Sequence, residues 1–166
     1  MPLDVEKRKQ IEQIFRKFLL NRAKTIRRLK MSDLDVNPFL IRILSHELGL
    51  DNSEAIVRWL VSQRLERGTV TSFGIALQDA AKVFSEGTGV DWVSGREFWE
   101  FISDDPQCLE EIYEITAEVG RTFKDPKGQS LSNIIEAKIQ ELAKQFERMY
   151  GRSASEMWKN LLEENS

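Results

Sequence analysis

The spacing of the apolar residues constrains the fold more than any other feature of this sequence. They recur every three or four positions, and in residues 5–30 one apolar stripe is formed by Ile11, Ile14, Phe15, Phe18, Leu19, Ile26 and Leu29. This period matches the 3.6-residue turn of an α-helix, and no convincing run shows the alternation of a half-buried strand. We therefore predict an all-α fold, a bundle of about seven to eight helices with no substantial sheet.

Start and stop signals place the ends of several helices. Asn37 followed by Pro38 is typical of a helix start, because the Asn side chain can accept from free N–H groups and Pro lacks one. That helix should end at Gly49. Asp51 with Glu54 three residues later matches a capping box, which predicts the start of the next helix.

Glycine and hydroxyl residues suggest a break in the middle of the chain. Gly68 is predicted to end the helix that starts after Gly49, and another helix should begin at Thr71 or Ser72 and continue to Phe84. Residues 85–89 contain two glycines and little apolar content, which indicates a linker.

Beyond this linker the same signals predict further helices. These run from Ser94 or Gly95 to Ile102, over residues 107–123, from Ser130 to near Gly151, and from Ser153, where Glu156 completes a second capping box. The predicted organisation is an N-terminal helical block over residues 1–86, a linker at 87–93 and a C-terminal helical block over 94–166. The two blocks could together form one compact domain.

Composition excludes several classes of protein. No stretch approaches the roughly 18 consecutive apolar residues of a membrane helix, and the charged N-terminus lacks the apolar centre of a signal peptide. The one cysteine, Cys108, excludes an internal disulfide, and with a single histidine it makes a zinc site implausible. The expected location is the cytoplasm, with no membrane partner.

The net charge of −3 conceals an uneven distribution of charge along the chain. Residues 1–30 contain ten Lys or Arg and three acids, whereas residues 91–120 contain nine acids and one Arg. Such a separation suggests either a basic face for a polyanion or two segments that attract one another.

A catalytic site is not apparent. His46 is the only histidine, which restricts any His-dependent triad, and the glycines at 87–89 lack the pattern of a phosphate-binding loop. Two segments match the sequence pattern of a metal-dependent nuclease site, in which two acids hold Mg²⁺ beside a lysine. In residues 136–138 a helix would point Glu and Lys apart, and residues 125–127 belong to a turn. We assign no catalytic and no metal-binding residue.

Two blocks of the chain resemble the PmeII family of type II restriction endonucleases. The first is RAKTIRRLKMSDLDVNPFLIR followed by SEAIVRWLVSQRLERGTVTSFGIALQDAAKVF, and the second is WVSGREFWEFISDDPQCLEEIYEITAEV. The most specific segments of this resemblance are NPFLIR and TSFG. The resemblance implies a basic helix, an NP-containing turn and helices that precede the catalytic strands.

The resemblance also implies a nuclease core between the two blocks, with Mg²⁺ as the cofactor of an intact family enzyme. This sequence passes directly from Val90 to Asp91, without the strands that would supply the acids and the lysine. We therefore expect a deletion form that lacks the active site, needs no cofactor and does not cut DNA alone.

The expected activity is non-specific binding of double-stranded DNA. Basic side chains would contact phosphates, and helix-start hydroxyl residues would add free N–H groups, although simple helix capping is the favoured explanation for these hydroxyl residues. The candidate DNA-binding residues are Arg22, Lys24, Arg27, Arg28, Lys30, Thr71 and Ser72.

Two alternatives remain open from the sequence. Loss of a sheet should expose apolar surface, so the chain could be a helical protein–protein assembly module that forms a homodimer and has no DNA role. A complete enzyme would instead need an unrecognised acid cluster, for example Asp104, Asp105 and Asp125 around Mg²⁺.

Overall fold

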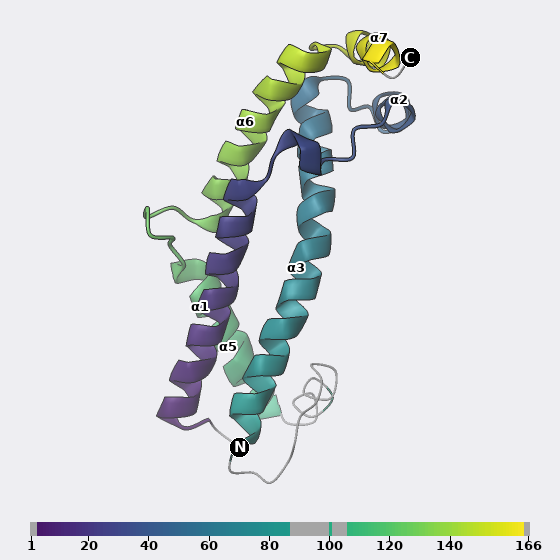
Figure 1. The fold of residues 1–166 in the computed structure, drawn as a ribbon. Helices are drawn as coiled ribbons and strands as arrows, with labels where there is room; N and C mark the ends of the chain where they lie inside the picture. Colours follow the sequence, from purple (N-terminus) through teal and green to yellow (C-terminus); the bar gives the residue numbers. More distant parts are fainter. Residues whose placement is uncertain (1–2, 87–99, 101–105, 165–166) are drawn as a thin grey trace. The chain divides into compact units, whose positions relative to one another are not determined.

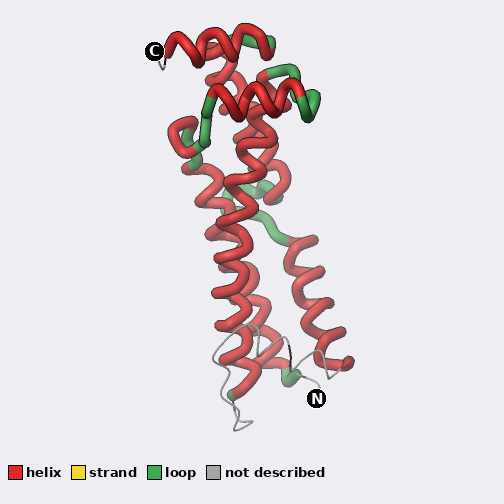
Figure 2. The backbone as a smooth tube through the Cα atoms, turned by 90° about the vertical axis from the view of Figure 1, so that its right-hand side faces the viewer, coloured by secondary structure: helices red, strands yellow, loops and turns green. Residues whose placement is uncertain are grey.

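A computed structural model describes residues 3–86, 100 and 106–164, and these residues form helices joined by short loops (Figures 1 and 2). The elements are α1 (Val5–Arg28), the 3₁₀ turn η1 (Met31–Asp33), α2 (Pro38–His46), α3 (Ser53–Ser85), α5 (Pro106–Thr122), α6 (Leu131–Tyr150) and α7 (Ala154–Glu164). No strand occurs in this part of the chain, which confirms the all-α class. The described residues contain six α-helices rather than seven to eight.

The predicted break at Gly68 is wrong, because α3 continues without interruption from Ser53 to Ser85. A glycine inside a helix costs roughly 1 kcal/mol relative to alanine, which a long and partly buried helix can tolerate. The predicted helix start at Thr71 or Ser72 is wrong for the same reason. The predicted helix beginning at Ser94 or Gly95 falls almost entirely outside the described residues.

The start of α2 is confirmed in atomic detail. Oδ1 of Asn37 accepts hydrogen bonds from the backbone N–H groups of Phe39 at 2.9 Å and of Leu40 at 3.3 Å, and Pro38 is the first helical residue. The helix ends at His46, and Gly49 follows with a φ of 68°. Because these signals are local, they could be read without knowledge of the tertiary fold.

The capping residue of α3 differs from the predicted one. Asn52, and not Asp51, accepts the helix-start hydrogen bond, from the N–H of Ala55 at 2.9 Å. The side chain of Glu54 therefore does not complete a capping box with Asp51, and it contacts Arg58 instead.

The second capping box, at the start of α7, is confirmed. Oγ of Ser153 accepts from the N–H of Glu156 at 3.2 Å, and the Glu156 carboxylate accepts from the N–H of Ser153 at 3.5 Å and of Arg152 at 2.9 Å. Gly151 ends α6 with a φ of 100°, a conformation that favours glycine.

The contacts of the chain divide it into two compact units, each built from two stretches of sequence. Unit 1 comprises Met1–Lys24 and Gly68–Leu131, and unit 2 comprises Thr25–Arg67 and Ser132–Ser166. The predicted linker at 87–93 lies outside the described residues.

The core of unit 1 lies between α1, α3 and α5. Lys7, at the start of α1, donates from Nζ to the carbonyl oxygen of Phe84, in the last turn of α3, at 3.2 Å, and to that of Glu86, just after the helix. Small residues of α3 allow the helices to approach closely. The buried cluster comprises Ile11, Phe15, Ala76, Ala80, Ala81, Phe84, Ile112, Ile115 and Val119.

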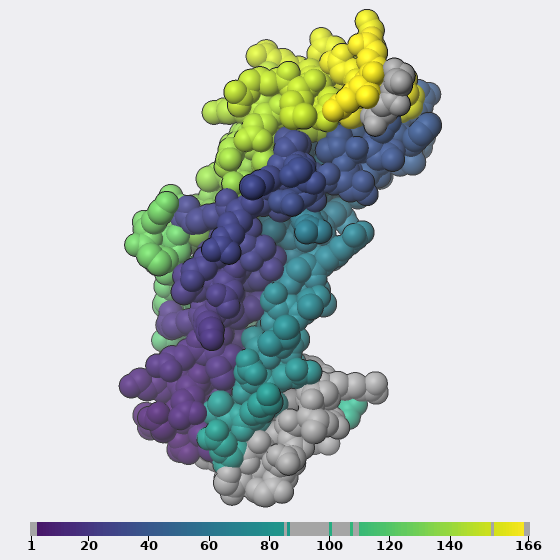
Figure 3. Space-filling view, in the orientation of Figure 1, coloured from purple at the N-terminus to yellow at the C-terminus, as the bar shows by residue number. Residues whose placement is uncertain are grey.

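The core of unit 2 draws on the end of α1, the first part of α3, and α2, α6 and α7. α2 and α7 pack against each other, as Figure 3 shows where the blue and yellow atoms meet. The largest fully buried side chains of the unit are Ile26, Ile41, Leu44, Ile56, Ile139, Leu142, Phe146 and Met157. In the part of the chain that the structure describes, none of the helices has both the length and the apolar character that crossing a lipid bilayer demands.

Candidate functional site

The end of α1 presents a group of basic side chains at the surface. Arg28 is exposed at the last residue of α1, Arg27 is half-buried beside it, and Lys30 is exposed just before η1. We call these three residues, all in unit 2, the basic cluster. Cations in the last turn of a helix interact favourably with the partial negative charge of its C-terminus.

Backbone hydrogen bonds fix the conformation of the chain at the basic cluster. The N–H of Leu29 donates to the carbonyl of Ile26 at 3.1 Å, which tightens the last turn of α1. The N–H of Lys30 donates to Oδ2 of Asp33 at 2.8 Å, so this carboxylate is held by the main chain just before η1. Lys24, which ends the first stretch of unit 1, is also exposed.

Arg22 occupies a different environment from the other candidate residues. Its side chain is buried, with 6% of its surface exposed. A Cβ built at Gly68 would lie 3.1 Å from both terminal nitrogens of the Arg22 guanidinium, so the absence of a side chain at position 68 makes room for Arg22. Burial lowers the pKa of Arg22. Arg22 thus packs inside unit 1 and does not belong to the exposed basic surface.

Thr71 and Ser72 lie inside α3. Thr71 is exposed and Ser72 is half-buried. Because their N–H groups lie within the helical ladder, the reason for expecting phosphate contacts from a free helix N-terminus does not apply to them. Ser72 lines a shallow groove of 570 Å³ between α1 and α3, together with Ile14, Phe18 and Ile75.

The two segments that match the sequence pattern of a nuclease motif, residues 136–138 and 125–127, make contacts that stabilise the fold. Lys138 is buried and pairs with Glu141 at 2.9 Å. Oδ1 of Asp125 accepts from the N–H groups of Lys127 at 3.0 Å and Gln129 at 2.8 Å, which builds the turn before α6. Asp104 and Asp105 lie outside the described residues. Among the residues that are described, no three His, Cys, Asp or Glu side chains gather in a way that could hold a metal ion.

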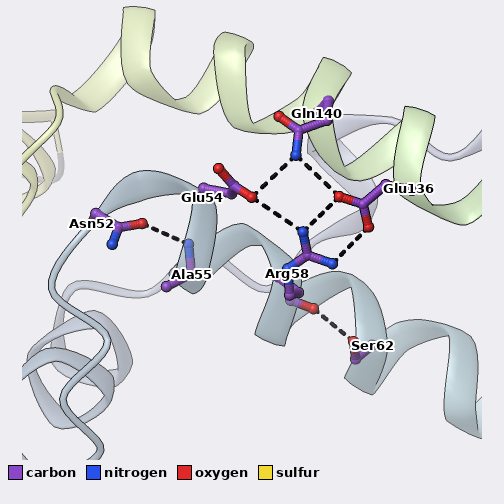
Figure 4. Close-up of polar contacts among 7 residues, drawn as sticks. All are labelled: Asn52, Glu54, Ala55, Arg58, Ser62, Glu136 and Gln140. Carbon is purple, nitrogen blue, oxygen red and sulfur yellow. Dashed lines mark hydrogen bonds and ion pairs between the residues drawn. The ribbon is translucent and has the colours of Figure 1, made fainter.

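A charged network joins α3 to α6 within unit 2 (Figure 4). The guanidinium of Arg58 donates to both carboxylate oxygens of Glu136 at 2.7 Å and to Glu54 at 3.1 Å. The amide of Gln140 donates to Glu54 and to Glu136, each at 3.1 Å. The hydrogen bonds from Arg58 lower the pKa of Glu136 to about 2. Because the partners are half exposed, this network is a structural tie and not a buried catalytic group.

An apolar surface on α2 and α7 was not anticipated from the sequence as a site. Phe39 and Ile43 of α2 are 68% and 54% exposed, and Leu162 of α7 is 42% exposed. The rings of Phe39 and Trp158 meet edge to face at 5.9 Å between centroids, and Arg42 lies 5.4 Å above the Trp158 ring. The spacing of Phe39 and Ile43 indicated one helix face, but no local signal distinguished an exposed face from a buried one.

The chain matches no protein-family model, no curated protein and no solved structure. The resemblance to restriction endonucleases therefore stays a prediction from the quoted segments. The function is argued below from the residues of this chain.

Proposed function

We propose that this protein is a helical remnant of a type II restriction endonuclease that binds the backbone of double-stranded DNA through the basic cluster and does not read base sequence. The observation that supports the proposal is the exposure of Arg28 and Lys30 in a stretch, residues 22–30, that contains five Lys or Arg and no acid. The origin from a restriction endonuclease rests on the NPFLIR and TSFG segments.

The chemistry of the cluster suits phosphate contacts. Arginine presents a planar fork of donors to phosphate oxygens, and lysine adds a compact charge. Such contacts release counterions from DNA and contribute affinity without sequence information. The helix N-terminus that often binds phosphate is absent here, so the side-chain charges must supply the attraction.

The number of cations sets the expected salt dependence. With three phosphate contacts the slope of log affinity against log salt is about −2.7, so an increase from 50 to 200 mM salt should weaken binding roughly 40-fold. Arg27 already has interactions within the protein, so its share should be smaller than that of Arg28 and Lys30. The proposal assigns no catalytic residue and no cofactor to the chain.

Charge reversal tests the proposal. The double variant Arg28→Glu with Lys30→Glu should lose most of the affinity for a 20-base-pair duplex, measured by fluorescence anisotropy at 50 mM salt. The matched control is Lys9→Glu with Lys144→Glu, which changes the net charge equally at two exposed helical lysines elsewhere. Circular dichroism verifies that both variants remain folded.

Two results would contradict DNA binding at this site. One is the absence of any binding by the unmodified chain at 50 mM salt. The other is an equal loss of affinity in the control, which would indicate a general effect of net charge and no role for the basic cluster.

A further inference from the structure

The middle of α3 is not held by packing. Leu65 is the last buried residue of α3 in unit 2, and Ala76 is the first buried residue of α3 in unit 1. None of residues 66–75, all of which the structure describes, is buried. At 3.6 residues per turn this stretch is a little under three turns long. A helix in a globular protein takes most of its stability from a packed face, so these turns lack the main source of it.

The same stretch is rich in residues that form helices poorly. Residues 68–74 read GTVTSFG, with a glycine at each end, three β-branched side chains, a serine and a phenylalanine. Glycine loses the most backbone entropy, β-branched and aromatic side chains lose rotamer freedom against the preceding turn, and serine competes for backbone hydrogen bonds. Residues 76–82, ALQDAAK, instead include three alanines, a leucine and a lysine, which favour helix. Packing and intrinsic preference are therefore weakest at the same place.

Contacts within unit 1 line the stretch but do not bury it. The Arg22 guanidinium lies against Gly68. The ring of Phe73 meets those of Phe15 and Phe18, at 6.1 Å and 5.8 Å between centroids. Phe73 nevertheless keeps 40% of its surface exposed. Opening the stretch therefore exposes little additional apolar surface, and the hydrophobic cost of opening is small.

We infer that α3 opens and recloses at residues 66–75 while the segments on either side stay folded. The opening breaks the backbone hydrogen bonds of these turns and costs less than unfolding either core, because few apolar contacts are lost. α3 is one helix when closed, and the stretch is a joint of low local stability between residues 53–65 and 76–85. The boundary between the two units falls in the same stretch, between Arg67 and Gly68. The inference does not rest on DNA binding.

Hydrogen–deuterium exchange of the full chain tests the opening. In the absence of denaturant, the N–H groups of residues 69–75 should exchange roughly 100-fold faster than those of residues 58–65, relative to the rates of unstructured chain. Urea below the unfolding transition should change the rates of residues 69–75 little, because a local opening exposes little surface. Exchange that requires global unfolding accelerates steeply with urea.

A variant that strengthens the helix makes the test specific. The triple variant combines Thr69→Ala, Val70→Ala and Gly74→Ala. The first two side chains are exposed, and a Cβ at Gly74 would meet nothing within 4 Å. The triple variant should slow exchange at residues 69–75 by roughly tenfold or more, because each change favours the closed helix.

The control is Ser62→Ala with Gln78→Ala, two exposed residues of α3 outside the stretch. These changes should leave exchange at residues 69–75 unchanged. Equal protection along the whole of α3 would overturn the inference, because it would show that the helix opens only with the rest of the fold. So would exchange that the triple variant does not slow, or that the control slows equally.

Discussion

At the scale of single residues, Gly68 and Gly74 show how one helix can contain two glycines for different reasons. A Cβ at Gly68 would lie 3.1 Å from the Arg22 guanidinium, whereas a Cβ at Gly74 would meet nothing within 4 Å. Both residues lie in the interior of α3, where glycine is less favourable than alanine. Only Gly68 is therefore linked to the packing of another side chain.

This difference predicts that alanine at these two positions has different effects on stability. Gly74→Ala should raise the free energy of unfolding by about 1 kcal/mol, because it improves helix propensity without a steric cost. Gly68→Ala should gain less or lose stability, because the buried Arg22 side chain must move. Urea denaturation of both variants measures the difference, and a larger gain from Gly68→Ala would contradict the packing that the structure describes.

At the scale of elements, hydrogen bonds between side chains tie α3 to α6. Arg58 on α3 and Glu136 on α6 are separated by 78 positions in the sequence, and their two hydrogen bonds are each 2.7 Å long. Sequence spacing alone could show that Glu136 and Lys138 point apart on a helix, but not that Glu136 faces Arg58. The network is exposed, so its contribution to stability should be modest and sensitive to salt.

The lowered pKa of Glu136 makes this tie dependent on pH. The folded-state pKa of Glu136, about 2, lies below the ordinary value of 4.5, so the network stabilises the fold above about pH 4.5 and loses that effect as pH falls towards 2. Glu136→Gln should therefore destabilise the protein at pH 7, and the difference from the unmodified chain should shrink between pH 4.5 and 2. Thermal unfolding across this range measures it. Glu66→Gln, an exposed residue of α3, is the control, and an equal pH dependence in both variants would exclude the Arg58 pairing as the cause.

At the scale of the whole molecule, what could be predicted from the sequence follows from how far each signal reaches. The helical class and the start of α2 depend on residues within a few positions of one another, such as Asn37 and Pro38, and the structure confirms both. The continuity of α3 and the burial of Arg22 depend on contacts between distant segments. The same limit applies to the candidate site, since the charge pattern made Arg22, Arg28 and Lys30 candidates alike and could not show that Arg22 is buried.

The corner between α6 and α7 has a consequence for inherited variation. Gly151 has a φ of 100°, and a Cβ at this position would lie 2.6 Å from Oε2 of Glu156. Any single-nucleotide missense change in this codon would therefore disturb the backbone and displace the Glu156 carboxylate, which accepts hydrogen bonds from the N–H groups just before α7. We expect purifying selection to be strong at this codon, even though the corner itself takes part in no proposed contact with DNA.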